Sequence, residues 1–193
     1  MLRTNQSFLV YIQQLYEAQP RKEDIIQKTF ARGKKLLTQH EKASRVMLIK
    51  EGIAKCFITE ENDKDYIVEF LGKGEIIGEI EGIRGTPCLC SIEAITPVDV
   101  YALSLSYFSA LIKKDLRLNN LLLEVFAQRI VYTSSRASYQ QLYTIEHSLS
   151  RLLTLQKQQS IEISKEDMAA YLGVTIRSLN RALKTVHKNK NAF

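Results

Sequence analysis

The spacing of apolar side chains changes along the chain, and each change marks a different kind of structure. Near the N-terminus, apolar residues recur at the spacing of one helix face and stop before Pro20. They are Phe8, Leu9, Ile12, Leu15 and Tyr16. This spacing predicts a short amphipathic helix at the start of the chain.

Between residues 28 and 104 the pattern becomes one of short β-rich runs, separated by glycines or polar turns. The runs are residues 46–49, 54–58, 66–71, 91–95 and 98–103. Several short strands at this spacing favour a sandwich or barrel, because the strand faces then bury one shared interior. We therefore expect residues 1–104 to form an N-terminal helix and a β-barrel.

Residues 105–143 contain neither proline nor glycine, which predicts a long helix. One stripe, Leu118, Leu122, Val125, Arg129 and Tyr132, follows an alternating four-and-three spacing, and a second consists of Leu123, Phe126 and Ile130. A helix with two stripes suits packing on its own barrel with one face and on a partner helix with the other. We assign the first stripe to the seam of a homodimer. The alternative is a helix wholly internal to one monomer.

Residues 144–193 predict a helix-turn-helix unit. A helix over residues 145–155 precedes Ser164, which is placed to cap a second helix with Glu166 and Asp167 in its first turn. Two helices that cross steeply need a small residue at their approach and one that tolerates positive φ at the turn. Ala169 and Gly173 meet these two requirements.

The last helix carries the side chains that suit DNA. Thr175 can cap it, and its predicted open face has the expected DNA-binding residues Thr175, Ile176, Arg177, Asn180, Arg181, Lys184 and Lys188. Arginine pairs with guanine, asparagine with adenine, threonine and lysine with phosphates, and isoleucine with a thymine methyl. The alternative is an ordinary helical hairpin with a basic face toward solvent.

The distribution of charge supports the DNA interpretation. The chain has a formal net charge of +6, with nineteen Lys/Arg against seventeen Asp/Glu in residues 1–143 and eight against four in residues 144–193. The basic excess is therefore relatively stronger in the last quarter of the chain, where a nucleic-acid face is expected.

Taken together, these segments resemble the cyclic-AMP receptor protein and fumarate–nitrate reduction regulator (Crp/Fnr) family. The resemblance rests on residues 30–34, 47–52, 70–79 and 163–181. It implies an α+β protein: a double-stranded β-helix (jelly-roll) barrel like a cyclic nucleotide-binding domain, a dimerisation helix over residues 105–143, and a helix-turn-helix domain over residues 144–193. It also implies a homodimeric transcription regulator that binds a two-fold symmetric operator, with RNA polymerase as a further candidate partner.

The chain departs from the nucleotide-binding members of that family at one position. Where those members have a phosphate-binding arginine, alignment places Cys88 and Leu89. A buried cyclic phosphate would lose its bidentate, charge-assisted bonds there. We expect no cyclic nucleotide and no cofactor, but an unidentified small-molecule effector near Gly78, Glu79, Arg84, Cys88 and Leu89. Glu79 matches a ribose-contacting position, and Arg84 is a candidate substitute for the missing arginine.

Other chemistries find little support in the sequence. An iron–sulfur cluster needs four thiolates, whereas the chain has three cysteines, and its three histidines are not clustered. No Ser-His-Asp or paired-carboxylate arrangement stands out, so we expect neither a metal site nor an enzyme. The polar N-terminus and the lack of an apolar stretch near 20 residues predict a cytoplasmic protein without membrane association.

The sequence leaves open whether the protein has a C-terminal wing and whether its helix-turn-helix binds DNA. The family usually follows its recognition helix with a β-hairpin wing, but only residues 188–193 remain here, so the wing is short or missing or the sequence stops early. The alternative function is a dimeric ligand-binding or protein-interaction module whose helix-turn-helix is vestigial. Strong salt dependence of DNA binding would separate the two functions.

Overall fold

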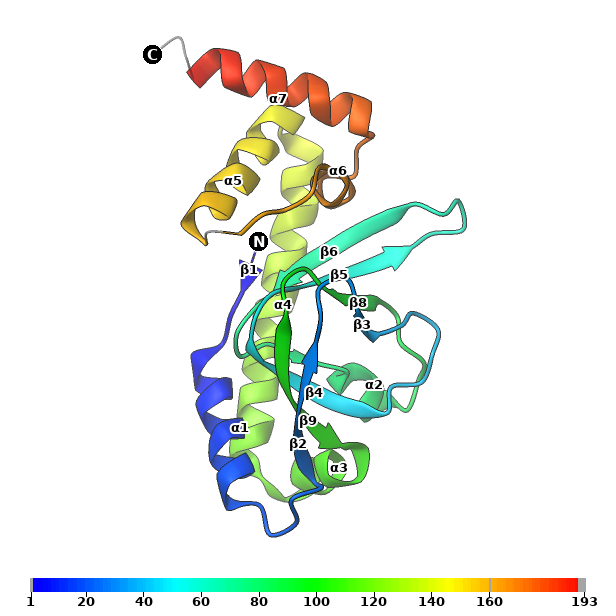
Figure 1. Ribbon diagram of the computed structural model, residues 1–193, viewed down its shortest axis with the longest axis vertical. Helices are drawn as coiled ribbons and strands as arrows, with labels where there is room; N and C mark the ends of the chain where they lie inside the picture. The colour runs from blue at the N-terminus through cyan, green and yellow to red at the C-terminus, as the bar shows by residue number, and fades with distance from the viewer. Residues whose placement is uncertain (1, 160, 191–193) are drawn as a thin grey trace.

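The computed structural model describes residues 2–159 and 161–190, and its strands form two sheets that face each other (Figure 1). The five-stranded sheet has the order β1 (Leu2–Arg3), β6 (Asp65–Leu71), β5 (Ala54–Thr59), β8 (Ser91–Ala94) and β3 (Lys35–Leu37). The four-stranded sheet has the order β2 (Ile25–Phe30), β9 (Val98–Ser104), β4 (Arg45–Glu51) and β7 (Ile76–Ile77). The predicted α+β class and N-terminal β-barrel are confirmed.

Each predicted β run is a strand, but four strands and one helix escaped prediction. The predicted runs correspond to β4, β5, β6, β8 and β9. Strand β2 alternates poorly because Gln27, Lys28 and Thr29 are all exposed at the edge of the sheet. Strands β1 and β7 have two residues each, β3 has three, and helix α2 (Glu79–Arg84) has six. Segments this short contain too few positions to show a period.

Two hydrophobic clusters hold the barrel together. One fills the space between the sheets and includes Ile49, Leu71 and Val100. The other lies under α1 (Gln6–Ala18), α3 (Leu105–Lys114) and the long helix α4 (Leu116–Leu142), where Phe8 and Phe108 are fully buried. Burying one such side chain stabilises the fold by about 1.5–3 kcal/mol, so the helices are integral to the barrel.

The helix predicted over residues 105–143 is interrupted at Asp115. The Asp115 N–H donates to the Leu111 carbonyl at 2.7 Å and so ends α3, while its carboxylate accepts the Leu118 N–H at 3.0 Å and starts α4. The Tyr11 hydroxyl also donates to this carboxylate, at 2.8 Å. An aspartate with these partners favours a helix start over continuation, which is why a run without proline or glycine still breaks.

The structure corrects the predicted dimer seam on α4. Leu118, Leu122 and Val125 are at most 4% exposed and pack against the barrel of the same chain, so they are not available to a partner. Arg129 also turns to the barrel, and Tyr132 is 39% exposed. The exposed apolar residues with heptad spacing are instead Leu116, Leu123 and Ile130. Of the second predicted stripe, Leu123 and Ile130 are exposed, whereas Phe126 packs against the barrel of its own chain.

The C-terminal helices share a core with the barrel. Helices α5 (Ile145–Gln158), α6 (Lys165–Leu172) and α7 (Ile176–Lys190) pack together at the end of α4, at the top of Figure 1. Their cluster includes Leu149, Met168 and Leu179, and also Phe57 and Phe70 from strands β5 and β6. Helix α7 continues through Lys190, and the rest of the predicted tail, residues 191–193, lies outside the described residues.

Within residues 2–159 and 161–190, no helix has both the length and the apolar character needed to cross a membrane.

Candidate functional site

Helix α6 begins and ends at the residues that its sequence predicts. The Ser164 hydroxyl accepts the Asp167 N–H at 3.0 Å, and Glu166 and Asp167 lie in the positive first turn of the helix. Gly173 ends the helix with φ +68°, and its N–H donates to the Ala169 carbonyl. A side chain at Gly173 would be strained by this backbone angle, which glycine adopts freely.

Helix α7 follows after a short turn and is anchored by its apolar side. The Thr175 hydroxyl accepts the Ser178 N–H at 3.2 Å, which satisfies a free donor at the helix start. Leu179, Ala182 and Val186 are at most 7% exposed and contact α5 and α6. The two helices therefore hold α7 rigidly with its other side toward solvent.

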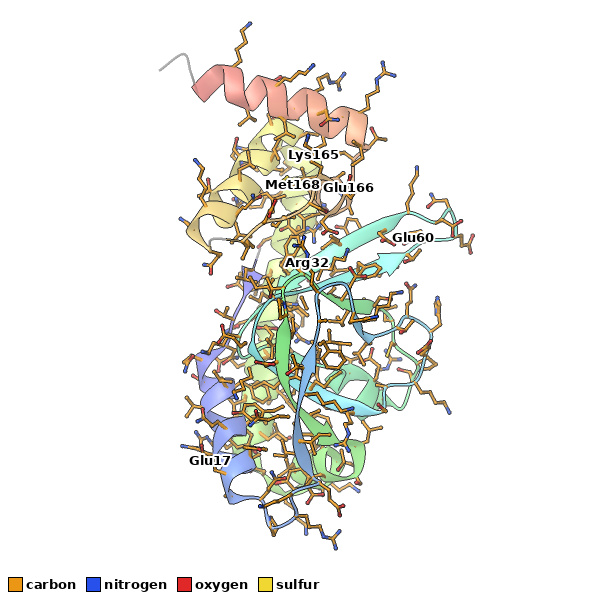
Figure 2. All side chains as sticks on the ribbon, in the orientation of Figure 1. Glu17, Arg32, Glu60, Lys165, Glu166 and Met168 are labelled. Carbon is orange, nitrogen blue, oxygen red and sulfur yellow. The ribbon has the colours of Figure 1, made fainter. Side chains whose placement is uncertain are left out.

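The solvent side of α7 carries the residues that the sequence assigned to DNA. Ile176, Arg177, Asn180, Arg181 and Lys184 line one shallow surface hollow. Thr175 and Lys188 are exposed as well. Figure 2 shows long side chains along α7 that project away from the rest of the molecule. Within the described residues this face carries cations and no carboxylate, which suits a phosphate-lined groove.

The interior of the barrel holds a cluster of buried charges. Glu79, at the start of α2, is 2% exposed and accepts a hydrogen bond from the Arg129 guanidinium. The same guanidinium donates to the Ile76 carbonyl at 2.7 Å and lies 3.3 Å from the Glu75 carboxylate. Burial raises the pKa of Glu79 above its usual value, although the Arg129 charge acts in the opposite direction.

A second arginine extends this cluster toward the N-terminus. The Arg3 guanidinium lies 3.9 Å from both the Glu69 and the Glu75 carboxylates. The cluster thus contains three carboxylates and two guanidinium groups, all largely removed from water. A further anion, such as a phosphate, would add to the excess of negative charge.

The five predicted effector residues differ in their exposure to solvent, and their role in effector binding stays a prediction. Glu79 is engaged by Arg129, and Gly78 precedes it at φ +80°. Cys88 is buried, whereas Arg84 and Leu89 are exposed, so Arg84 does not take the place of an interior phosphate-binding arginine. Arg129 fills that interior from α4 instead. Arg129 was predicted to lie in the dimer seam, but a single charged residue among the apolar residues of one helix stripe indicates a buried ion pair instead.

Two of the three cysteines are neighbours: Cys56 is in β5, and Cys90 directly precedes β8. The Cys56 and Cys90 thiols form a hydrogen bond. This bond and burial raise the pKa of Cys56, while the bond lowers the pKa of Cys90 against the effect of its burial. Burial also raises the pKa of Cys88. In the part of the chain that the structure describes, no three His, Cys, Asp or Glu side chains are arranged so that they could hold a metal ion.

Comparison with known proteins identifies the fold. Residues 27–115 match the family model of the cyclic nucleotide-binding domain, which spans the chain from within β2 to the end of α3. Solved structures, among them one of a Crp/Fnr family regulator, match 86% of this chain. The chain has the Crp/Fnr fold. The resemblance inferred from the sequence is confirmed at the level of the fold.

Three solved structures with the Crp/Fnr fold illustrate the likeness. The c-di-GMP-responsive global regulator CLP of Xanthomonas campestris is 16% identical with a TM-score of 0.77, covering 86% of this chain and 88% of its own. A Crp/Fnr regulator of Eubacterium rectale is 16% identical with a TM-score of 0.75, covering 86% and 80%. FixK2 of Bradyrhizobium japonicum is 18% identical with a TM-score of 0.71, covering 86% of each chain. No curated protein sequence matched this chain significantly.

Proposed function

We propose that this protein is a sequence-specific, DNA-binding transcription regulator of the Crp/Fnr type, and that it acts as a cytoplasmic homodimer on a two-fold symmetric operator. One observation carries the proposal: an anchored helix presents Arg177, Asn180, Arg181 and Lys184 on one open face. Arginine and asparagine are the side chains that read guanine and adenine in the major groove. No catalytic role is proposed, and RNA polymerase is the further candidate partner.

Arg177 and Arg181 are the proposed base-reading residues. They lie four residues apart on α7 and both are exposed, so both side chains point to the same side of the helix. Replacing either with alanine is expected to cost about 1–3 kcal/mol on the best operator and to relax one base pair per half-site. Lys188→Ala should instead weaken all sequences alike and reduce the salt slope by about one unit.

Binding selections on randomised duplex DNA test this function. The expected result is one enriched palindromic sequence for the natural protein and an altered preference for each arginine variant. DNA binding should also weaken steeply with added salt, because bound lysines and arginines release counterions from the phosphates. Absence of any enriched sequence would contradict the proposal and favour the vestigial helix-turn-helix.

We further propose that cyclic AMP is not the signal for the barrel. The argument is that Arg129 already pairs with Glu79 and Glu75, so a cyclic phosphate would have to break that buried pair and enter among carboxylates. Calorimetric titration of the protein with cyclic AMP should show no binding in the micromolar range, and cyclic AMP should leave DNA affinity unchanged. Micromolar binding would overturn this part of the proposal.

A further inference from the structure

A cleft of about 480 Å³ lies between α4 and α5, near the junction of the barrel with the C-terminal helices. Its walls are residues of α4 from Tyr132 to Gln140 and residues of α5 from His147 to Gln158. Glu69 of β6 and Tyr171 of α6 close its inner end. This volume lies within the usual range for small-molecule sites.

The cleft is lined with aromatic rings. Tyr132, Tyr139, His147 and Tyr171 all contribute to its walls. Tyr139 stacks on Tyr143 with ring centroids 4.8 Å apart, and Tyr143 stacks on His147 at 4.6 Å. Stacked rings hold each other in place, so the aromatic wall of the cleft is preformed.

The cleft also has an excess of positive charge. Its charged residues are Arg136, Arg151 and Glu69, and the Glu69 carboxylate already lies 3.9 Å from Arg3. Arg136 donates to carbonyl oxygens, which carry no net charge. Arg151 is exposed, and its guanidinium lies 4.4 Å from the Tyr139 ring centroid. A guanidinium held over a ring keeps its edge free to donate to an anion.

The dimer seam leaves this cleft open. At about 100° per residue, Tyr132 and Tyr139 lie about 160–180° around α4 from Leu123, the middle residue of its exposed apolar stripe. A partner helix on that stripe therefore packs on the opposite side of α4. The cleft stays accessible in the expected dimer.

We propose that this cleft binds an organic anion with a flat aromatic ring, either an aromatic phosphate such as a nucleotide or an aromatic carboxylate. The ring packs among the aromatic side chains of the cleft walls, and the anionic group accepts hydrogen bonds from Arg151. Hydroxyl groups of Ser135 and Ser148, also in the cleft walls, supply further donors. This site lies outside the barrel interior, and ligand binding there does not depend on whether the chain binds DNA.

Isothermal titration of the full-length protein with four probes tests the required chemistry. Guanosine monophosphate carries a ring and a phosphate, 1-naphthoate carries a ring and a carboxylate, guanosine carries only the ring, and inorganic phosphate carries only the charge. Guanosine monophosphate or 1-naphthoate, or both, should bind with a Kd below about 100 µM. Guanosine and inorganic phosphate should each bind at least about tenfold more weakly. The relative affinities of guanosine monophosphate and 1-naphthoate show whether the cleft prefers an aromatic phosphate or an aromatic carboxylate.

Variants locate the site. Arg151→Ala should weaken the bound probe at least about tenfold, and Arg151→Lys should weaken it less because it retains the charge. Arg117→Ala is the matched control. Arg117, on α4, is exposed like Arg151, and its guanidinium lies 5.1 Å from the centroid of a tyrosine ring, that of Tyr11. It is not part of the cleft. This variant should leave affinity unchanged.

Three results would overturn the proposal. The first is a Kd above about 1 mM for both aromatic anions. The second is binding of guanosine or inorganic phosphate as tight as that of the aromatic anions. The third is an equal effect of Arg151→Ala and Arg117→Ala on affinity. Because Arg151 and Arg117 are both exposed, thermal unfolding of each variant is expected to match that of the natural protein.

Discussion

Arg129 lies among carboxylates that the barrel removes from water. Its guanidinium contacts Glu75 and Glu79, which are 4% and 2% exposed. A buried carboxylate without a counter-charge is costly, whereas a protonated carboxyl needs none. The contribution of Arg129 to stability therefore depends on the ionisation of its partners.

Arg129→Met is expected to destabilise the protein by about 3–5 kcal/mol at pH 7, because it leaves Glu79 buried and unpaired. Burial already raises the pKa of Glu79 in the folded state. A folded state with a raised carboxyl pKa binds more protons than the unfolded state, so stability falls as pH rises through this range. Urea unfolding should thus show that Arg129→Met lowers the free energy of unfolding less near pH 4 than at pH 7. An equal loss at both pH values would contradict this account.

The pKa of Asp115 is shifted in the opposite direction to that of Glu79, so its effect on stability should have the opposite pH dependence. Burial opposes its ionisation, but the Leu118 N–H and the Tyr11 hydroxyl outweigh this effect and hold its pKa below the usual value. Its stabilising effect is present above the ordinary aspartate pKa and is lost as pH falls through the lower, folded value. Asp115→Ala should cost about 0.5–2 kcal/mol at pH 7 as the start of α4 loses its cap. Thermal unfolding should show this difference shrinking at strongly acidic pH.

At the scale of elements, α4 has two faces with different partners. Leu118, Leu122 and Val125 secure it to its own barrel, and Leu123 and Ile130 are 66% and 68% exposed. An exposed apolar stripe at seven-residue spacing is typical of a helix that pairs with another helix. The proposed dimer therefore rests on the second stripe.

Leu123→Glu with Ile130→Glu should convert the dimer into a monomer, because two carboxylates would be buried in the seam. Both side chains are exposed within one chain, so the monomer should keep its fold. Leu142→Glu is the control, since Leu142 is 76% exposed on α4 but lies off the heptad spacing. Sedimentation at micromolar concentration measures the difference. A dimer that persists in the double variant would show that the seam lies elsewhere.

Local patterns predicted the elements better than their contacts. The caps at Ser164 and Thr175 and the turn at Gly173 depend on neighbouring residues, and the structure has them as the sequence predicts. The long strands were also evident from their apolar runs. The meeting of Arg129 with Glu79 joins residues 50 positions apart and leaves no periodic signal. The break at Asp115 likewise depends on Tyr11, which is 104 positions away.

At the scale of the whole molecule, polar contacts and a shared core join the sensor to the DNA-binding helices. Arg136 of α4 donates to the carbonyls of Ile67 and Val68 in β6 and of Tyr171 in α6. Lys55 of β5 forms a 2.7 Å ion pair with Asp167. These bonds fix the orientation of α6, and α7 with it, relative to the barrel.

Arg136→Ala should separate the unfolding of the two parts. It leaves three carbonyls without their charged donor, and hydrogen bonds to charged groups contribute about 1.5–3 kcal/mol. The natural protein should unfold in urea in a single transition, and the variant in a broader or biphasic one that begins with α5–α7. Arg177→Ala, on the exposed face of α7, should leave the transition unchanged. A single unshifted transition for Arg136→Ala would show that this arginine does not couple the two parts.

The shared core has a consequence for modularity. Phe57, Ile67 and Phe70 belong to strands of the sensor, yet they pack in one cluster with Leu149 and Leu179 of the C-terminal helices. A fragment that starts after α4 would leave part of that cluster uncovered, and the truncated sensor would expose the aromatic remainder. Recombination with a related regulator at residue 143 would therefore have to transfer the β5–β6 hairpin together with the helices. The unit that can be exchanged in evolution or engineering is discontinuous in sequence.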